Sequence, residues 1–591
     1  MTYMPEFVPY RQKDEPPRRA GIIKVKVPLE EMSDNQLQLI GHLNRAADEM
    51  NTIFVQQCFK GTTEIADMLR TLRPYLAEQE QKHLDEYLTI LHLQNCPWTS
   101  VPRKNHLLLI DPEGVESAAQ QAGETERLQR YRDFLFDEVE LPKKAEFYPD
   151  EMTEEQLQQL GEEGLKVNTV IREKQKQYVA IRNEELFRDA CERAAGHLAE
   201  ARKWSEDPEF TIYLDAKIEE LRTGSDEARR LADYHWVRHS SSVDIIISTA
   251  LEVYVDGWQN AKGSACAGVL TKNSEMDSLL QQFVKEVPEW ERSAPWKWKR
   301  TKINPEQLPK LKFVDVWNWT GDYVSSPLTV LAQSLPNDEW VGKQIGTVNL
   351  VYKNTGDAVH TVRGDIMARE FLPQRVVREY GEVLFYGDQV HATLHEIGHT
   401  TGRQDPEHPQ QPSVYLKDEY SILEETRAEL FGMWASVQAA EAGIISPHVS
   451  DACQFSMVIS MVNALKFKAE QAHNIARNMI FHFLKEQGTL QIVEEDGKNK
   501  VALDLTKTHT AVEKMLAMVG DIKSSGNREA AVELREQYCF EDPLKSEIEA
   551  RTQKIPLGTG LIFPVVKRAE GSFIREIEYP EFTQQAKFSH W

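Results

Sequence analysis

Apolar residues at helical spacing dominate this chain and are interrupted by a shorter region of β-branched runs. Residues 29–95 and 124–240 carry Leu and Ala at intervals of three and four among many Glu and Gln, which predicts helices. The spacing of apolar residues changes near residue 241. From there on, short β-branched runs predict strands at 242–248, 251–255, 314–319 and 347–352. Helical spacing returns over 375–490.

The two ends of the chain add less regular segments. Residues 1–20 show no clear period and are predicted to be irregular. Residues 490–493 and 501–505 flank Asp496-Gly497, a dipeptide that favours a tight hairpin turn. A last helical region is predicted over 507–550, before an extended tail. The whole pattern predicts an α+β fold in which helices dominate.

Composition narrows the class of protein. The 591 residues are 41% hydrophobic and 27% charged, which suits a globular chain of several domains. The net charge of −24 disfavours binding to nucleic acid or anionic membrane. The six cysteines form no C-x-x-C pair, and neither an apolar leader nor a membrane-spanning run is visible. We therefore expect a cytoplasmic protein with free thiols and with neither nucleic-acid nor membrane partners.

The motif His395-Glu396-Ile397-Gly398-His399 carries the clearest chemistry. On a helix, His395 and His399 lie one turn apart on the same face, which lets two imidazoles hold one Zn²⁺. The glutamate between them can take a proton from metal-bound water. An apolar stripe of Val390, Leu394 and Ile397 predicts that the opposite face is buried, and Gly402 predicts the helix end.

A catalytic zinc needs a third protein ligand, and the sequence offers two candidates. Asp405 follows the His-Glu-x-x-His motif at the spacing of the last metzincin ligand. Glu425 stands on a second predicted helix, which the Ser421–Glu424 pattern would cap, and it shares one face with Glu429. Spacing alone does not separate Asp405 from Glu425. His391 is predicted to lie behind the site or in the core.

Several blocks of the chain resemble the dipeptidyl peptidase III family of zinc exopeptidases. They occur in family order over about residues 145–590, whereas the first 140 residues match weakly. Glu424-Glu425-Thr426-Arg427-Ala428-Glu429 resembles the family's Glu-Glu-Cys-Arg-Ala-Glu/Asp motif. The other matching blocks are Phe147-Tyr148-Pro149-x-x-Met152-Thr153, Leu251-Glu252-Val253-Tyr254-x-Asp256, Leu335-Pro336-Asn337-Asp338-Glu339 with Lys353-Asn354, and Gln471-Ala472-His473-Asn474-Ile475-Ala476-Arg477.

This resemblance implies a zinc site and its chemistry. One Zn²⁺ per chain would be bound by His395, His399 and Glu425. Glu396 would act as general base, with His473 and Tyr254 contacting or polarising the scissile carbonyl. The residues implied behind the ligands are Glu424 and Glu429.

The resemblance also implies how the substrate is held. Glu252 and Asn337 would bind the free α-amino group of a peptide, and Arg477 would contact the substrate elsewhere. Ser334 stands among the substrate contacts where the family often has Asn, and a hydroxyl cannot reproduce both amide functions. The chain departs from the family in three further respects: the ligand motif lacks one residue, Thr426 replaces Cys, and a family Arg is absent near 558–560.

The resemblance further implies two lobes with a wide cleft. Residues 1–270 would form mostly the lower lobe with a β-barrel core, completed by about 318–365 and 557–591. Residues 271–556 would form mostly the upper, helical lobe that carries zinc. We predict a monomer or weak homodimer that releases dipeptides from the free N-terminus of oligopeptides. The alternatives are a metzincin-like endopeptidase using Asp405, a peptide-binding protein of the same fold with weak catalysis, or a hydrolase of non-peptide molecules.

Overall fold

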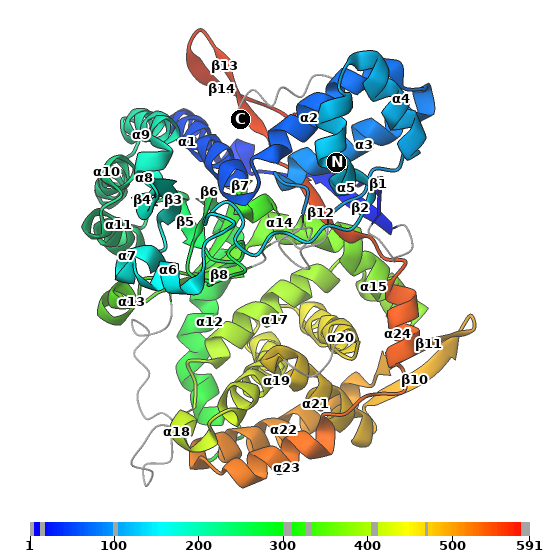
Figure 1. Ribbon diagram of the computed structural model, residues 1–591. Coiled ribbons are helices and arrows are strands. Elements are labelled where there is room, and N and C mark those ends of the chain that lie inside the picture. Colours follow the sequence, from blue (N-terminus) through cyan, green and yellow to red (C-terminus); the bar gives the residue numbers. More distant parts are fainter. Residues whose placement is uncertain are drawn as a thin grey trace. The chain divides into compact units, whose positions relative to one another are not determined.

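The computed structural model divides the chain into two compact units (Figure 1). We call Met1–Asn273, Leu311–Val362 and Pro556–Trp591 the sheet unit, and Ser274–Lys310 with Arg363–Ile555 the helical unit. The structure describes residues 5–11, 18–98, 105–299, 310–325, 330, 332–402, 412–466 and 471–580. The predicted helix-dominated α+β class is confirmed. In the described parts of the chain, none of the helices combines the length and hydropathy that crossing a membrane requires.

A curled five-stranded sheet with the order β5-β6-β7-β9-β8 forms the centre of the sheet unit. Its strands are β5 (Val243–Glu252), β6 (Ser264–Lys272), β7 (Lys310–Gly321), β8 (Ala332–Leu335) and β9 (Val348–Tyr352). β5, β6 and β7 pair antiparallel, and β5 is buried along most of its length. Burial on both faces explains why β5 appears in the sequence as a nearly continuous apolar run rather than as an alternating pattern.

Helix α1 (Asp34–Cys58) packs against this sheet and supplies hydrogen bonds where the β5–β6 ladder is interrupted. The helix begins at a capping box in which Ser33 and Gln36 satisfy each other's backbone N–H groups. The register of β5 and β6 shifts between Ser248 and Glu252, which interrupts the ladder of hydrogen bonds. The buried side chain of Gln57 fills this gap, because its amide donates to Thr249 O at 3.0 Å and accepts from Ala265 N at 2.7 Å.

Further helices and small strand pairs complete the sheet unit. The helices are α2 (Gly61–Leu72), α3 (Glu78–Gln94), α4 (Pro112–Ala122), α5 (Thr125–Phe136), α6 (Glu154–Gln158), α7 (Gly161–Leu165), α8 (Asn183–Leu186), α9 (Arg188–Arg202), α10 (Pro208–Thr223), α11 (Asp226–Arg238), α13 (Glu339–Ile345) and α14 (Lys353–Val359). The strands are β1 (Glu6–Tyr10), β2 (Arg18–Lys24) and β12 (Leu557–Ile562) in one sheet, with hairpins β3 (Thr169–Lys174)–β4 (Gln177–Arg182) and β13 (Val565–Ala569)–β14 (Ser572–Glu578).

The helical unit is built around three long helices that pack against one another. These are α17 (Leu384–Gly398), α19 (Glu419–Glu441) and α20 (Pro447–Ala464). The remaining elements are α12 (Ser274–Ser293), α15 (Asp365–Phe371), α16 (Gln374–Tyr380), α18 (Pro412–Leu416), α21 (Ala472–Glu486), α22 (Leu505–Ser525), α23 (Arg528–Tyr538), α24 (Lys545–Thr552) and the hairpin β10 (Leu490–Glu495)–β11 (Lys498–Leu503). The predicted hairpin turn is confirmed, since Asp496 and Gly497 have φ of 52° and 70°.

Four local predictions are wrong, each for a physical reason. Residues 253–255 form a turn rather than a strand, because the chain wraps around the carboxylate of Asp256. Residues 6–10 and 18–20 are strands, since β2 pairs in parallel with β12 from the other end of the chain. The β3–β4 hairpin was missed because Gln175 and Lys176 take positive φ without glycine. Helix α19 already begins at Glu419, so Ser421 does not cap it.

Candidate metal and substrate site

Helix α17 presents the two histidines of the His-Glu-x-x-His motif. Its apolar face is buried as predicted, with Val390, Leu394 and Ile397 at 0%, 0% and 5% exposure. Burial of that face turns His395 and His399 together toward the opposite side. The predicted stop at Gly402 is four residues too late, because α17 ends at Gly398. Gly402 instead lies in the segment after the helix, where it has φ of 72° and donates its N–H to Glu291 Oε2 at 2.7 Å.

Helix α19 brings Glu425 to the two histidines. The Nε2 atoms of His395 and His399 lie 3.2 Å apart. Glu425 Oε2 lies 3.3 Å from His395 Nε2 and 3.8 Å from His399 Nε2. Among the described residues, His395, His399 and Glu425 form the group whose ligand atoms lie close enough together to hold one metal ion.

These separations suit a zinc ion. Four ligands placed tetrahedrally at about 2.0–2.1 Å from Zn²⁺ are separated from one another by roughly 3.3 Å. The three observed separations of 3.2, 3.3 and 3.8 Å are close to that value. Moreover, Glu425 Oε2 is buried and accepts no hydrogen bond from the described residues. Imidazole nitrogens of His395 and His473 lie 3.3 and 3.2 Å from this oxygen, and a cation at this point would complete its partners.

The outer nitrogens of both imidazoles face carboxylates. His399 Nδ1 donates to Glu424 Oε1 at 2.8 Å, and His395 Nδ1 lies 3.6 Å from Glu429 Oε2. A proton on each Nδ1 leaves each Nε2 with its lone pair directed at the common point. The structure thus places Glu424 and Glu429 beside the outer nitrogens of the two imidazoles.

Arg427, to which the sequence analysis gave no role, holds this arrangement from behind. Its guanidinium is buried and contacts Glu424 twice, at 2.7 and 3.1 Å. It also donates to Gly398 O at 2.8 Å and Thr401 Oγ1 at 3.0 Å, which ties the end of α17 to α19. Lys523 of α22 contacts the same carboxylate. The contact between Glu424 and Arg427 could be predicted from the sequence, because residues three positions apart on a helix are neighbours. The contact between Lys523 and Glu424 could not, because the two residues are far apart in the chain.

The electrostatics of the cluster favour a cation between the imidazoles. Burial opposes the charge of Glu424, but Arg427, His399 and Lys523 outweigh it and hold the pKa of that carboxyl well below its usual range. The pKa of Glu429 is likewise held well below its usual range, because Arg477 and His395 outweigh the effect of burial. Burial lowers the pKa of His395, yet Glu429 and Glu425 reverse this and raise it to about 10. A divalent metal binds such a site by displacing the proton.

Helix α21 supplies the last groups of the cluster. His473 is half exposed, and its Nδ1 lies 3.2 Å from Glu425 Oε2. Arg477 Nε donates to Glu429 Oε1 at 2.8 Å, and the arginine side chain is 31% exposed. His391 is buried, and its Nε2 lies 3.0 Å from the backbone oxygen of Glu429, which accounts for this histidine as a core residue.

Glu396 lies on α17 between the two histidines and is partly exposed. Asp405, the alternative third ligand, lies outside the described residues.

The predicted substrate residues of the sheet unit meet at the end of β5. Glu252 closes this strand, and its Oε1 accepts from Gln333 Nε2 at 2.6 Å. Asn337 Nδ2 donates to Leu251 O at 3.3 Å, so that both residues lie at the same strand end. Burial raises the pKa of Glu252, although the contacts with Gln333 and Asn337 oppose the shift. Tyr254 lies in the turn after β5 and is 57% exposed.

In strand β8, it is Gln333 and not its neighbour Ser334 that contacts Glu252 of β5. Successive residues of a strand point to opposite faces, so Ser334 is turned away from the face that Gln333 occupies. Gln333 Oε1 is held in turn by the hydroxyls of Tyr323 and Tyr352, at 2.6 and 3.0 Å. Gln333 belongs to none of the predicted site residues, and the alternation of side chains within β8 is the signal that points to it.

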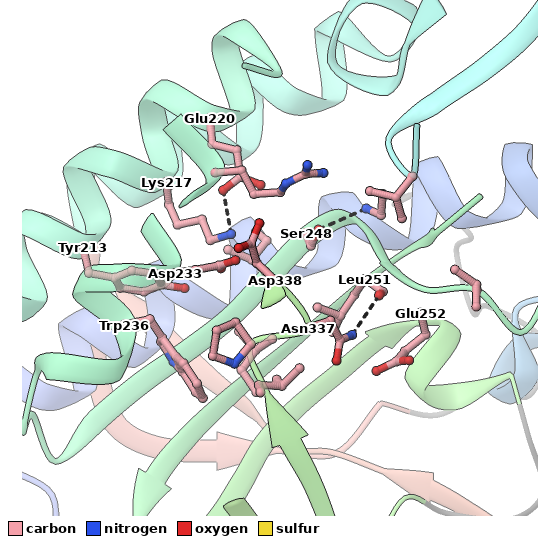
Figure 2. A pocket seen from close by; sticks show the side chains of 18 residues that line it. Tyr213, Lys217, Glu220, Asp233, Trp236, Ser248, Leu251, Glu252, Asn337 and Asp338 are labelled. Atoms are coloured by element: carbon pink, nitrogen blue, oxygen red, sulfur yellow. Dashed lines mark hydrogen bonds and ion pairs between the residues drawn. The ribbon is translucent and has the colours of Figure 1, made fainter. Parts of the chain in front are cut away.

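A cavity of about 540 Å³ adjoins Glu252 and Asn337 within the sheet unit (Figure 2). Its other walls include Lys217, Asp233 and Trp236 from α10 and α11. Lys217 is buried and paired with Glu220 at 2.6 Å. Burial raises the pKa of Asp233 to about 7, with Lys217 opposing the shift. The cavity therefore combines a largely apolar lining with four carboxylates, those of Glu220, Asp233, Glu252 and Asp338.

Comparisons with known proteins agree with this architecture. No family model matches the chain. A curated relative, Nudix hydrolase 3 of Arabidopsis thaliana, is 23% identical over 93% of this chain and 73% of that protein. Dipeptidyl peptidase III from Caldithrix abyssi superposes with a TM-score of 0.72 at 23% identity, covering 92% of this chain and 97% of that one.

A second solved structure gives the same result. Dipeptidyl peptidase III from Corallococcus sp. strain EGB has a TM-score of 0.61 at 19% identity, covering 91% of this chain and 94% of that one. The similarity in both cases extends over nearly the whole length of both chains. By its architecture, this chain has the dipeptidyl peptidase III fold.

Proposed function

We propose that this protein is a zinc-dependent exopeptidase of the dipeptidyl peptidase III family, which releases dipeptides from the free N-terminus of oligopeptides. The observation that carries the proposal is the cluster of His395, His399 and Glu425, with its buried carboxylate oxygen that accepts no hydrogen bond from the described residues. This cluster occurs on a fold shared with solved dipeptidyl peptidases III.

In the proposed mechanism, His395, His399 and Glu425 hold the metal. When bound, Zn²⁺ supplies Lewis acidity, which activates water and polarises a carbonyl. Glu396 accepts a proton from the attacking water and delivers it to the nitrogen of the leaving amine. The partial exposure of Glu396 is compatible with this exchange of protons.

Two further side chains are proposed to act on the carbonyl oxygen. His473 and Tyr254 would donate hydrogen bonds as negative charge develops there. Both have exposed side chains, with His473 at 52% and Tyr254 at 57%. Arg477 would contact the substrate through the guanidinium nitrogens that its bond to Glu429 Oε1 leaves available.

Glu252 and Asn337 are proposed to bind the substrate's α-ammonium group. Glu252 Oε1 is oriented by Gln333, and Asn337 lies at the same end of β5. Gln333 of β8, rather than Ser334, is proposed to orient Glu252 at this end. A carboxylate facing an ammonium selects free N-termini over blocked ones, which gives an exopeptidase its specificity. We also propose a cytoplasmic location, which the free thiols of all six cysteines support.

Mass spectrometry of the products tests this proposal. Zinc-loaded protein is incubated with matched free and N-acetylated tetra- to octapeptides. Dipeptides released only from free N-termini are the expected result. Single residues or internal cuts would contradict dipeptide release and the ammonium anchor. Peptide binding by calorimetry without any product would contradict catalysis and favour a binding protein of the same fold.

A further inference from the structure

Two sequence blocks that are far apart in the chain meet in the sheet unit. Tyr148 belongs to the Phe147-Tyr148-Pro149 block, and Asp256 ends the Leu251–Asp256 block. The Tyr148 hydroxyl donates to Asp256 Oδ2 at 2.9 Å, although the two residues are separated by 108 positions. Both side chains are buried, with Asp256 at 0% and Tyr148 at 3% exposure. The proposed mechanism uses neither of them.

The carboxylate of Asp256 organises the loop that joins β5 to β6. Its Oδ1 accepts from the backbone N–H groups of Trp258 and Gln259, at 3.1 and 3.0 Å. Its Oδ2 accepts from the N–H groups of Ala261 and Lys262, each at 2.9 Å, in addition to the Tyr148 hydroxyl. A carboxylate offers about four lone-pair positions, so these donors saturate it. The loop is therefore closed around one buried charge.

The loop in turn fixes the ring of Tyr148. The indole of Trp258 meets the Tyr148 ring edge-on, with centroids 4.8 Å apart. The ammonium of Lys262 lies 5.7 Å from the centre of the same ring and donates to Lys166 O at 3.0 Å. The backbone beside Tyr148 is tied to β3, because Ile171 N donates to Phe147 O at 2.8 Å. Tyr148 is thus a rigid anchor rather than a mobile surface side chain.

This anchor acts on the segment that presents Tyr254. Tyr254 stands two residues before Asp256 and extends from the loop with 57% exposure. At the start of the loop, Ser264 Oγ donates to Glu252 O at 3.0 Å and fixes the strand end. The backbone at Tyr254 therefore lies between two fixed points, Glu252 and Asp256. A side chain presented from a fixed backbone loses less conformational freedom when substrate binds than one on a mobile loop.

We propose that Tyr148 and Asp256 are positioning residues that direct Tyr254 toward the substrate. This inference rests on the proposed function, because it assumes that Tyr254 acts on the scissile carbonyl. It assigns a role to the Phe147-Tyr148-Pro149 block, which contributes no group to the proposed chemistry. This role differs from a contribution to the stability of the fold, because it requires that Tyr148 affect catalysis only by way of Tyr254.

A double-mutant cycle tests this requirement. Tyr148→Phe, Tyr254→Phe and the double variant are compared with wild type by kcat and KM on a free-N-terminal peptide. Tyr148→Phe is expected to lower kcat about tenfold, the loss typical of a hydrogen bond to a charged group. In the Tyr254→Phe background the same change is expected to lower kcat by less than about twofold, because coupled residues are not additive.

Tyr131→Phe provides a matched control. Tyr131 is a buried tyrosine of the same unit whose hydroxyl also donates to a carboxylate, Glu64 Oε2, at 2.7 Å. Its replacement should leave kcat unchanged within about twofold. Equal effects of Tyr148→Phe in both backgrounds would overturn the inference, as would an unchanged kcat. Wild-type protein without peptidase activity would instead refute the proposed function.

Hydrogen exchange tests the anchor without relying on activity. Asp256→Asn replaces one acceptor oxygen with an NH₂ group, so either the N–H groups of Trp258 and Gln259 or those of Ala261 and Lys262 lose their partner. Faster exchange at one of these pairs of amides is expected, with a smaller change in the isosteric Tyr148→Phe variant. Unchanged protection in both variants would overturn the claim that the carboxylate and hydroxyl hold this loop.

Discussion

His399 Nδ1 donates to Glu424 Oε1 at 2.8 Å, and this bond turns Nε2 of the same ring toward His395 Nε2. Glu424 is itself held by Arg427, which also binds the backbone of Gly398 in the last turn of α17. The orientation of one proposed ligand is therefore fixed through a chain of buried contacts that reaches a second helix. Contacts of this kind set the basicity and the geometry of metal ligands.

Replacing Glu424 should weaken metal binding without abolishing it. In Glu424→Gln, the charge facing His399 Nδ1 is lost, and the affinity for zinc should fall about 10- to 100-fold. Competition with a chromogenic chelator measures this affinity. Glu419→Gln is the matched control, because Glu419 is a buried glutamate of the same helix paired with Arg535 instead. Equal affinities in the two variants would contradict an orienting role for Glu424.

Two single substitutions decide the identity of the third ligand. Glu425→Ala should remove most bound zinc, because it deletes the oxygen that lies 3.3 Å from His395 Nε2. Asp405→Ala should leave one zinc per chain. Metal content after dialysis, measured by atomic emission, checks both variants. Zinc loss in Asp405→Ala with retention in Glu425→Ala would support the metzincin-like alternative instead.

Glu396→Gln should separate catalysis from metal binding. The amide is nearly isosteric but cannot accept a proton from water, so kcat should fall by about 10²–10⁴-fold. Zinc content and the unfolding temperature should remain near those of the wild type, since Glu396 is not among the grouped ligand residues. A variant that keeps its turnover would exclude Glu396 as general base.

Glu252→Gln should reduce the preference for free N-termini. Loss of the carboxylate removes a charge-assisted bond worth about 1.5–3 kcal/mol, so kcat/KM for free peptides should fall about 10- to 100-fold. Any residual rate on N-acetylated peptides should be unchanged, because these substrates carry no ammonium. Comparison of the two substrate series in both proteins provides the control, and a parallel loss in both series would argue against the ammonium contact.

Asp233 should give the sheet unit a measurable dependence of stability on pH. Burial raises the pKa of Asp233 to about 7, so the folded protein holds this proton more tightly than the unfolded chain. The resulting stabilisation is fully present below about pH 4 and is lost as pH rises through about 7, up to about 4 kcal/mol. Asp233→Asn removes this contribution.

Urea unfolding at several pH values measures the effect. The free energy of unfolding of the wild type minus that of Asp233→Asn should decrease steadily between about pH 4 and pH 7. Other titrating groups cancel in this difference as long as they do not contact Asp233. Parallel curves for the two proteins would show that Asp233 titrates normally.

Local sequence patterns captured much of the fold, because they report on interactions between near neighbours. The spacing His395–Glu396–His399 and the apolar stripe of α17 follow from the period of a helix. Asp496-Gly497 defined its hairpin because both residues tolerate positive φ. The β3–β4 turn, in contrast, forms at Gln175-Lys176, although neither residue type favours the positive φ that both adopt.

The sequence by itself determined the elements, the paired histidines and the family-like blocks, since each is encoded within a few residues. Only the tertiary structure decided which distant groups meet. The fold places Glu425 beside His395 and brings Arg427 and Lys523 into contact with Glu424. It also brings Gln333, rather than Ser334, into contact with Glu252. It also joined Tyr148 to Asp256. Such pairings depend on how helices and strands pack after they form, and no period or spacing along one segment carries that information.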